Sequence, residues 1–101
     1  MNEALMKNYE ETFMEKVVVI HAAFDEKPHT VAFVMVDKSL SDLEKCEEAF
    51  MKTNTIEDAW WVNDGVVYIH DEPTCRSTAT DDFVVVGQTK YKCSRVGWEK
   101  V

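Results

Sequence analysis

The stretch over residues 41–54 constrains the fold most strongly, because it carries both a helix start and the spacing of an amphipathic helix. Ser41 and Glu44 have the spacing of a capping box, in which each side chain accepts a backbone N–H of the first turn. Four apolar residues then fall on one side of a helix: Leu43, Cys46, Ala49 and Phe50. We therefore predict a helix over about 41–53 that packs on a sheet, with Leu43 and Phe50 buried against Val18, Ile20 or their neighbours.

Residues 17–24 form the most strand-like segment of the chain. They read VVVIHAAF, so β-branched residues dominate and apolar side chains fall on both faces of a strand. A strand of this kind is usually central and covered on both sides. The predicted helix would cover one face, and either the N-terminal segment or a partner subunit would cover the other. Residues 30–36 follow a turn that contains Pro28 and are expected to complete a hairpin.

Four further extended segments are predicted after the helix, over residues 66–70, 83–86, 89–93 and 97–101. Asn63-Asp64-Gly65 and Gly87-Gln88 supply turn residues between them. Residues 1–15 are expected to add an amphipathic helix, with Leu5, Met6, Tyr9 and Phe13 on one face, or else a loosely ordered extension. The order of elements predicts a single α+β domain over residues 1–101 with a mostly antiparallel sheet.

Charge separates the partner classes that this chain favours from those it disfavours. The 101 residues carry a formal net charge of −8, which disfavours binding to a phosphate backbone. Residues 1–75 hold 16 acids and 6 bases, whereas residues 76–101 hold 3 acids and 5 bases. An acidic body of this kind suits a basic protein surface, although it is also common in domains without such a partner.

Cysteine usage and hydropathy indicate the compartment. Cys46, Cys75 and Cys93 make an odd number, and no secretory leader or membrane-spanning run is recognisable. We therefore expect free thiols and a cytoplasmic protein. A homodimer is compatible with the sequence.

Residues 76–98, RSTATDDFVVVGQTKYKCSRVGW, resemble the C-terminal part of small uncharacterised proteins of tailed phages and mobile elements. The shared features are an Arg-Ser-Thr segment, an apolar strand, a turn, a Tyr-containing strand and a Gly-aromatic close. Here Asp81-Asp82 stands where that pattern has Gly-Asp, and Trp98 stands for its Phe. The resemblance implies a phage-like, cytoplasmic context and assigns no activity and no catalytic residue.

Metal binding and catalysis are both disfavoured by the residues present. No CxxC, HxxxH or HExxH spacing occurs, so His70, Cys75 and Cys93 would form a zinc site only if the third strand lay beside the last hairpin. Cys75, beside Arg76 and five residues from His70, is the one candidate nucleophile. We expect no metal, no cofactor and no enzymatic activity.

Arg76, Ser77 and Thr78 form a candidate anion site, because a guanidinium and hydroxyls can together hold an anion. The alternative is that the hydroxyls bond loop backbone groups and Arg76 pairs with Asp81 or Asp82. A small ligand-binding or enzymatic domain that uses this Arg76 loop remains the alternative to a binding module.

Trp60 and Trp61, beside Glu57 and Asp58, form the candidate partner-binding site. Adjacent side chains diverge, so a small core is not expected to absorb both indoles fully, and a partly exposed indole can anchor a basic protein partner. The alternative is that both indoles cap the two sides of one small core. The sequence therefore favours a small acidic protein-binding module, in the phage context an accessory or host-modulating protein. An oligomer-forming phage component is a further alternative.

Overall fold

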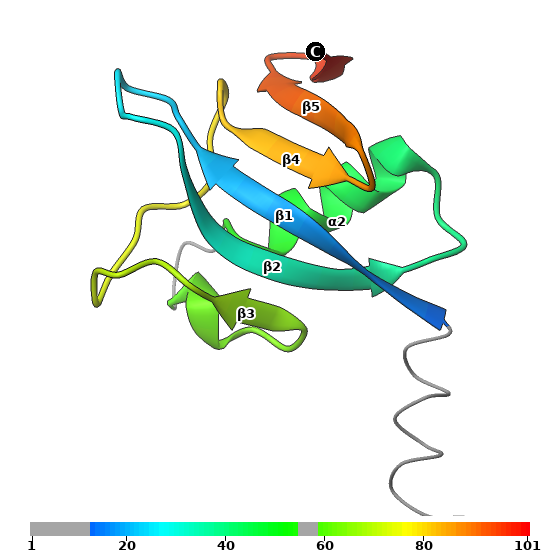
Figure 1. Cartoon of the computed structure of the whole chain (residues 1–101), viewed down its shortest axis with the longest axis horizontal. Helices are drawn as coiled ribbons and strands as arrows, with labels where there is room; N and C mark the ends of the chain where they lie inside the picture. Colours follow the sequence, from blue (N-terminus) through cyan, green and yellow to red (C-terminus); the bar gives the residue numbers. More distant parts are fainter. Residues whose placement is uncertain (1–12, 55–58) are drawn as a thin grey trace, which may run out of the picture.

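A computed structural model describes residues 13–54 and 59–101, which form a six-stranded antiparallel sheet with one helix laid across it (Figure 1). The strand order is β3-β2-β1-β4-β5-β6. The elements are β1 (Met14–His21), β2 (His29–Asp37), α2 (Asp42–Lys52), the short 3-10 helix η1 (Trp60–Val62), β3 (Val66–Tyr68), β4 (Phe83–Val86), β5 (Thr89–Ser94) and β6 (Gly97–Lys100). The predicted α+β class and antiparallel sheet are confirmed.

The central strands are β1 and β2, which form the predicted hairpin. Val17 lies opposite Val34, and the pairing shifts by one residue between Val19 and Ile20. On its other side β1 pairs with β4, so the valine-rich segment is a central strand as expected. The predicted turn at Gly87 also forms, with a φ of 58° that suits glycine.

Helix α2 begins with the predicted capping box. The Ser41 hydroxyl accepts the Glu44 N–H at 3.2 Å, and the Glu44 carboxylate accepts the Ser41 N–H at 3.0 Å. Cys46 and Ala49 are fully buried against the sheet, where valines of β1, β2 and β4 meet them. Lys45 is buried as well, and its ammonium lies 3.0 Å from the Glu15 carboxylate of β1.

The prediction that Leu43 is buried under the helix is wrong. Its side chain is 51% exposed, and Phe50 is only half-buried. The apolar stripe of α2 is wider than the line along which the helix touches the sheet. Small residues occupy that line, so the larger apolar side chains lie at its margin.

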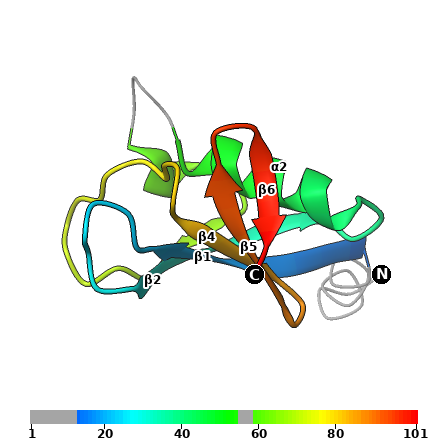
Figure 2. The ribbon, with the colours of Figure 1, turned by 90° about the horizontal axis from the view of Figure 1, so that it is seen from above.

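The two faces of the sheet differ. The helix lies on one side, as Figure 2 shows, and covers Val17 and Val19. Val18 and Ile20 point to the opposite side, because side chains alternate along a strand. The helix therefore packs on their neighbours Val17 and Val19, which the prediction also allowed, and not on Val18 and Ile20 themselves. Among the described residues no helix or strand covers this second face.

The N-terminal helix predicted over residues 1–15 lies mostly outside the described residues. Met14 and Glu15 already belong to β1, so the predicted end of that helix is wrong. No helix among residues 13–54 and 59–101 is long and apolar enough to cross a membrane.

Candidate functional site

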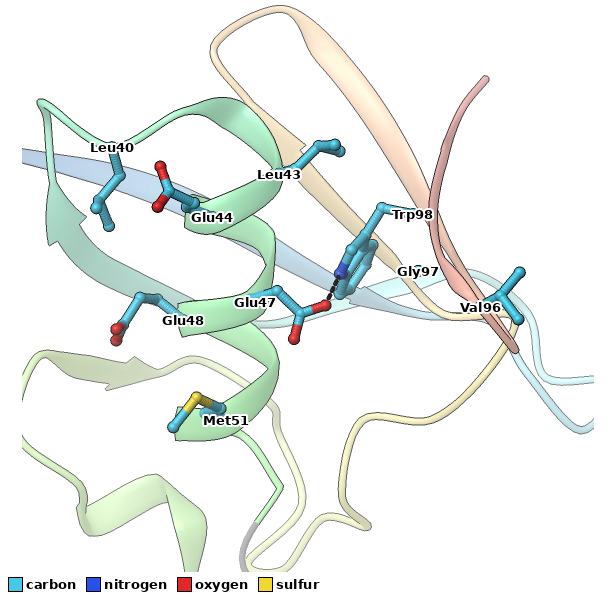
Figure 3. A pocket seen from close by; sticks show the side chains of 9 residues that line it. All are labelled: Leu40, Leu43, Glu44, Glu47, Glu48, Met51, Val96, Gly97 and Trp98. Carbon is cyan, nitrogen blue, oxygen red and sulfur yellow. Dashed lines mark hydrogen bonds between the residues drawn. The ribbon is translucent and has the colours of Figure 1, made fainter.

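A groove lies between α2 and the β5–β6 hairpin. Its volume is about 470 Å³, and Figure 3 shows the side chains that line it. Leu43 and Met51 contribute apolar surface from the helix, and Val96 contributes it from the hairpin turn. They are 51%, 64% and 96% exposed. This groove lies on the helix side of the sheet, close to the molecular surface.

Trp98 holds the hairpin against the helix and so shapes the groove. Its indole N–H donates to the Glu47 carboxylate at 2.8 Å (Figure 3). Its ring also lies edge-on to that of Phe50, with the ring centroids 6.2 Å apart. Tyr91 of β5 donates its hydroxyl to Asp42 at 2.8 Å, at the first turn of the helix. Aromatic groups with one polar atom suit such a boundary between core and solvent.

Three carboxylates give the groove its charge. Glu44, Glu47 and Glu48 line it, and no basic residue appears among its described lining residues. The backbone N–H and hydroxyl of Ser41 hold the pKa of Glu44 below its usual range, so Glu44 stays ionised well into acid. The groove therefore combines exposed apolar side chains with negative charge.

A buried polar cluster lies at the other end of the sheet, around Asp82. One carboxylate oxygen of Asp82 accepts the backbone N–H groups of Ala22 and Ala23 at 2.8 and 2.9 Å, and the other accepts that of Ala79 at 2.8 Å. Arg76 donates to both oxygens, at 2.7 and 2.8 Å. Burial alone would raise the pKa of Asp82, but these donors outweigh it and hold the pKa low.

Arg76 is thus engaged by carboxylates at the predicted anion site. Besides Asp82, its guanidinium contacts the Glu26 carboxylate, with one N–H···O distance of 2.7 Å. The hydrogen bonds with Asp82 raise the pKa of Arg76 although burial acts against them. Thr78 is buried and Ser77 is half-buried. An anion would have to displace Glu26 to reach the guanidinium, and the predicted site at these residues stays a prediction.

His21 is fully buried beside Asp82, and a chain of hydrogen bonds fixes its tautomer. Thr53 donates its hydroxyl proton to the Ala49 carbonyl at 2.8 Å. Because that is its only hydroxyl proton, its oxygen must accept the hydrogen bond from the Thr78 hydroxyl, 2.7 Å away. Nε2 of His21, 2.9 Å from the Thr78 hydroxyl, must then carry the proton. Its Nδ1 is left as an acceptor. Burial lowers the pKa of His21 to about 4, against the opposing field of Asp82.

Cys75 meets that acceptor, with 3.6 Å between its sulfur and Nδ1 of His21. Burial raises the pKa of the Cys75 thiol to about 11, although Arg76 acts in the opposite direction. Neutral pH therefore favours a neutral thiol that donates to a neutral imidazole, which is a structural contact more than an activated nucleophile. The sequence offered His70 as the partner, whereas the fold supplies His21 from a strand 54 residues away.

The three candidate zinc ligands, His70, Cys75 and Cys93, do not all come together. Strand β3, which precedes His70, is at one edge of the sheet, and β2, β1 and β4 separate it from the β5 strand of Cys93. Within the part of the chain that the structure describes, no group of three or more metal-ligating residues has the geometry to hold an ion. Cys46, Cys75 and Cys93 are free thiols.

The two tryptophans of the candidate partner site have different environments. Trp60 is 2% exposed, and its indole N–H donates to the carbonyls of Cys75 and Arg76 at 3.2 and 3.0 Å. Trp61 is half-buried and stacks on Tyr68, with ring centroids 5.4 Å apart. Glu57 and Asp58 lie outside the described residues. Trp60 is thus a core residue in this fold, and contact of Trp61 with a partner stays a prediction.

Sequence reasoning missed the groove because its residues were assigned elsewhere. The helical stripe predicts Leu43 in the core, and Trp98 belongs to the C-terminal pattern only as its aromatic close. The available signal was the surplus of apolar residues on the helix, since Met51 continues the row of Leu43 and Glu47 at intervals of four.

No protein-family profile, curated protein or solved structure matches this chain. The groove, the buried cluster and the tryptophans are therefore interpreted from their own geometry.

Proposed function

We propose that this protein is a small acidic binding module without catalytic activity, and that the groove between α2 and the β5–β6 hairpin receives a basic, amphipathic segment of another protein. The observation that carries the proposal is the combination of exposed Leu43, Met51 and Val96 with three glutamates around one groove. Apolar contact supplies affinity, whereas the carboxylates select a basic partner and speed its approach.

The dimensions of the helix agree with a short helical or extended ligand. The 11 residues of α2 span about 16 Å, so a ligand of three to four helical turns would contact the whole groove. Helix-in-groove recognition uses apolar anchors of this spacing, and lysines or arginines beside them would face Glu44 and Glu48. The resemblance of residues 76–98 to phage proteins supports a bacterial host protein as the source of that segment.

A selection from a displayed library of random peptides tests this proposal directly. Peptides selected against the wild-type protein should carry net positive charge beside leucine-like anchors, and their affinity should fall with added salt. Leu43→Lys should weaken them by at least about tenfold, since it removes an anchor and adds a repelling charge.

Val67→Lys is the matched control. Val67 is 51% exposed, the same as Leu43, but it lies on the opposite face of the sheet. Its substitution should leave the affinity unchanged. Neutral or acidic selected peptides, or equal effects of the two lysines, would refute the groove as the binding site.

The alternative, a ligand-binding or enzymatic domain at the Arg76 loop, has one observation in its favour. Cys75 donates to an imidazole nitrogen whose other side is hydrogen-bonded, an arrangement that also orients catalytic bases. Burial favours the neutral thiol of Cys75 and the neutral imidazole of His21, which argues against an enzymatic function. The rate of thiol alkylation separates the two functions, because an activated Cys75 would react quickly at neutral pH.

A further inference from the structure

The face of the sheet opposite α2 carries apolar side chains where a solvated face would carry polar ones. Val18 lies opposite both Phe33 and Val85, and Phe33 lies opposite Val67, so these four residues form a row across four strands. Ile20 and Phe83 pair in the same way further along β1 and β4. An antiparallel sheet with one solvated face normally alternates apolar with polar residues.

Lysines border this open face. The Lys16 ammonium lies 4.4 Å from the centre of the Phe33 ring, and that of Lys90 lies 4.2 Å from the centre of the Phe83 ring. Both cations therefore sit over aromatic rings at the margin of the apolar row. In a chain of net charge −8, these two cations give the apolar row a basic border, and Asp37 and Glu99 lie further out on the same face.

We propose that residues 1–12 of the same chain cover this open face. This segment is joined directly to the sheet, because β1 starts at Met14. The Phe13 carbonyl accepts the Lys38 N–H at 2.9 Å, which fixes the point where the segment meets the sheet. Twelve residues span about 18 Å as a helix and about 40 Å when extended. The extended length reaches from the start of β1 past Ile20, about 20 Å along the strand, whereas the helical length ends just short of Ile20.

The composition of the segment matches the face in both respects. It contains Leu5, Met6 and Tyr9 as apolar side chains, and its three glutamates exceed its one lysine. Its residues Glu10 and Glu11 are the acids closest in sequence to the start of β1, and Lys16 lies near that start. The groove beside α2 carries three glutamates and would repel the same segment, so charge directs it to the open face.

A second copy of the chain fits this face less well than the attached segment. Two open faces packed together would bring the lysines of both copies to one interface, and like charges there oppose association. The attached segment also has a high effective concentration, because its end is fixed beside the face.

Photo-crosslinking in the full-length chain tests this arrangement. A benzophenone amino acid at Leu5, irradiated in an equal mixture of ¹⁵N-labelled and unlabelled chains, should crosslink to peptides that contain Val18, Phe33 or Val85. These products should join residues of a single chain. Lys90→Glu should remove most of that yield, whereas Glu47→Lys on the opposite side should leave it unchanged.

Val96 provides the matched position for the photo-reactive group, because it is 96% exposed beside the groove and should give no product with the open face. Products that join labelled to unlabelled chains would assign the face to a second copy and refute the proposal. Products at the groove, or none at all, would refute it as well. The peptide selection against Leu43→Lys is independent of each result, so failure here leaves the proposed groove function separately testable.

Discussion

Asp82→Asn should be among the most destabilising conservative substitutions in this protein. The side chain is fully buried and accepts three backbone N–H groups as well as two from Arg76. An amide keeps one oxygen acceptor but replaces the other with an NH₂ donor. That donor would confront the N–H groups of Ala79 or Arg76, and the guanidinium would lose the full charge of its buried partner.

The expected cost follows from this geometry. Breaking a buried ion pair by neutralising one partner costs about 3–5 kcal/mol, and small domains are stable by only about 5–15 kcal/mol. We therefore expect Asp82→Asn to lower the free energy of unfolding by about 3 kcal/mol or more. Urea unfolding followed by tryptophan fluorescence measures it, because the indole of Trp60 bonds to the carbonyl of Arg76.

Glu26→Gln is the matched control, since it neutralises the other carboxylate that contacts the Arg76 guanidinium. The Glu26 side chain is 32% exposed, whereas that of Asp82 is fully buried. Partly exposed pairs contribute about 1 kcal/mol or less. Equal costs for the two substitutions, or a cost below about 1 kcal/mol for Asp82→Asn, would show that the Asp82 network does not anchor the fold.

Three further predictions rest on individual side chains. Burial lowers the pKa of His21 to about 4 in the folded protein, whereas the imidazole titrates near 6.5 in the unfolded chain, so the unfolded chain binds more protons between these pH values. The free energy of unfolding should therefore fall by about 3 kcal/mol from pH 6.5 to pH 4. Urea unfolding at each pH measures this change, and a flat profile would contradict a buried neutral imidazole. Cys75 should react with iodoacetamide at pH 7 more slowly than a free cysteine, because its raised pKa of about 11 leaves little thiolate. Mass spectrometry of the labelled peptide measures the rate, and faster labelling would favour the enzymatic alternative. Leu43→Ala should change the free energy of unfolding little, whereas Ala49→Leu at a fully buried position should lower it by about 1–3 kcal/mol through overpacking. Urea unfolding measures both, and a larger cost for Leu43→Ala would show that Leu43 belongs to the core.

The sequence alone determined the elements whose signals are local. The capping box at Ser41 and Glu44 needs only residues three apart, and it formed as predicted. The turn at Gly87 and the flanking strands also follow from neighbouring residues, because backbone conformation and β-branched side chains act over a few positions. The α+β class followed from the order of these elements.

Tertiary structure decided which side of each element is buried. On α2 the apolar stripe is wider than the contact line, so periodicity could not tell that Cys46 and Ala49 face the sheet while Leu43 borders a groove. On β1 both faces are apolar, so alternation could not tell which one the helix covers. Both choices depend on how closely the helix approaches the sheet, which small residues permit and large ones oppose.

The strand order decided the candidate sites. Pairing of β1 with β4 brings His21 beside Thr78 and Asp82, which are 57 and 61 positions away in the chain. The same order places β3 at the far edge and separates His70 from Cys93. Local signals fixed the strands, but their neighbours were chosen by contacts between distant residues, which no pattern within a single segment of this sequence encodes.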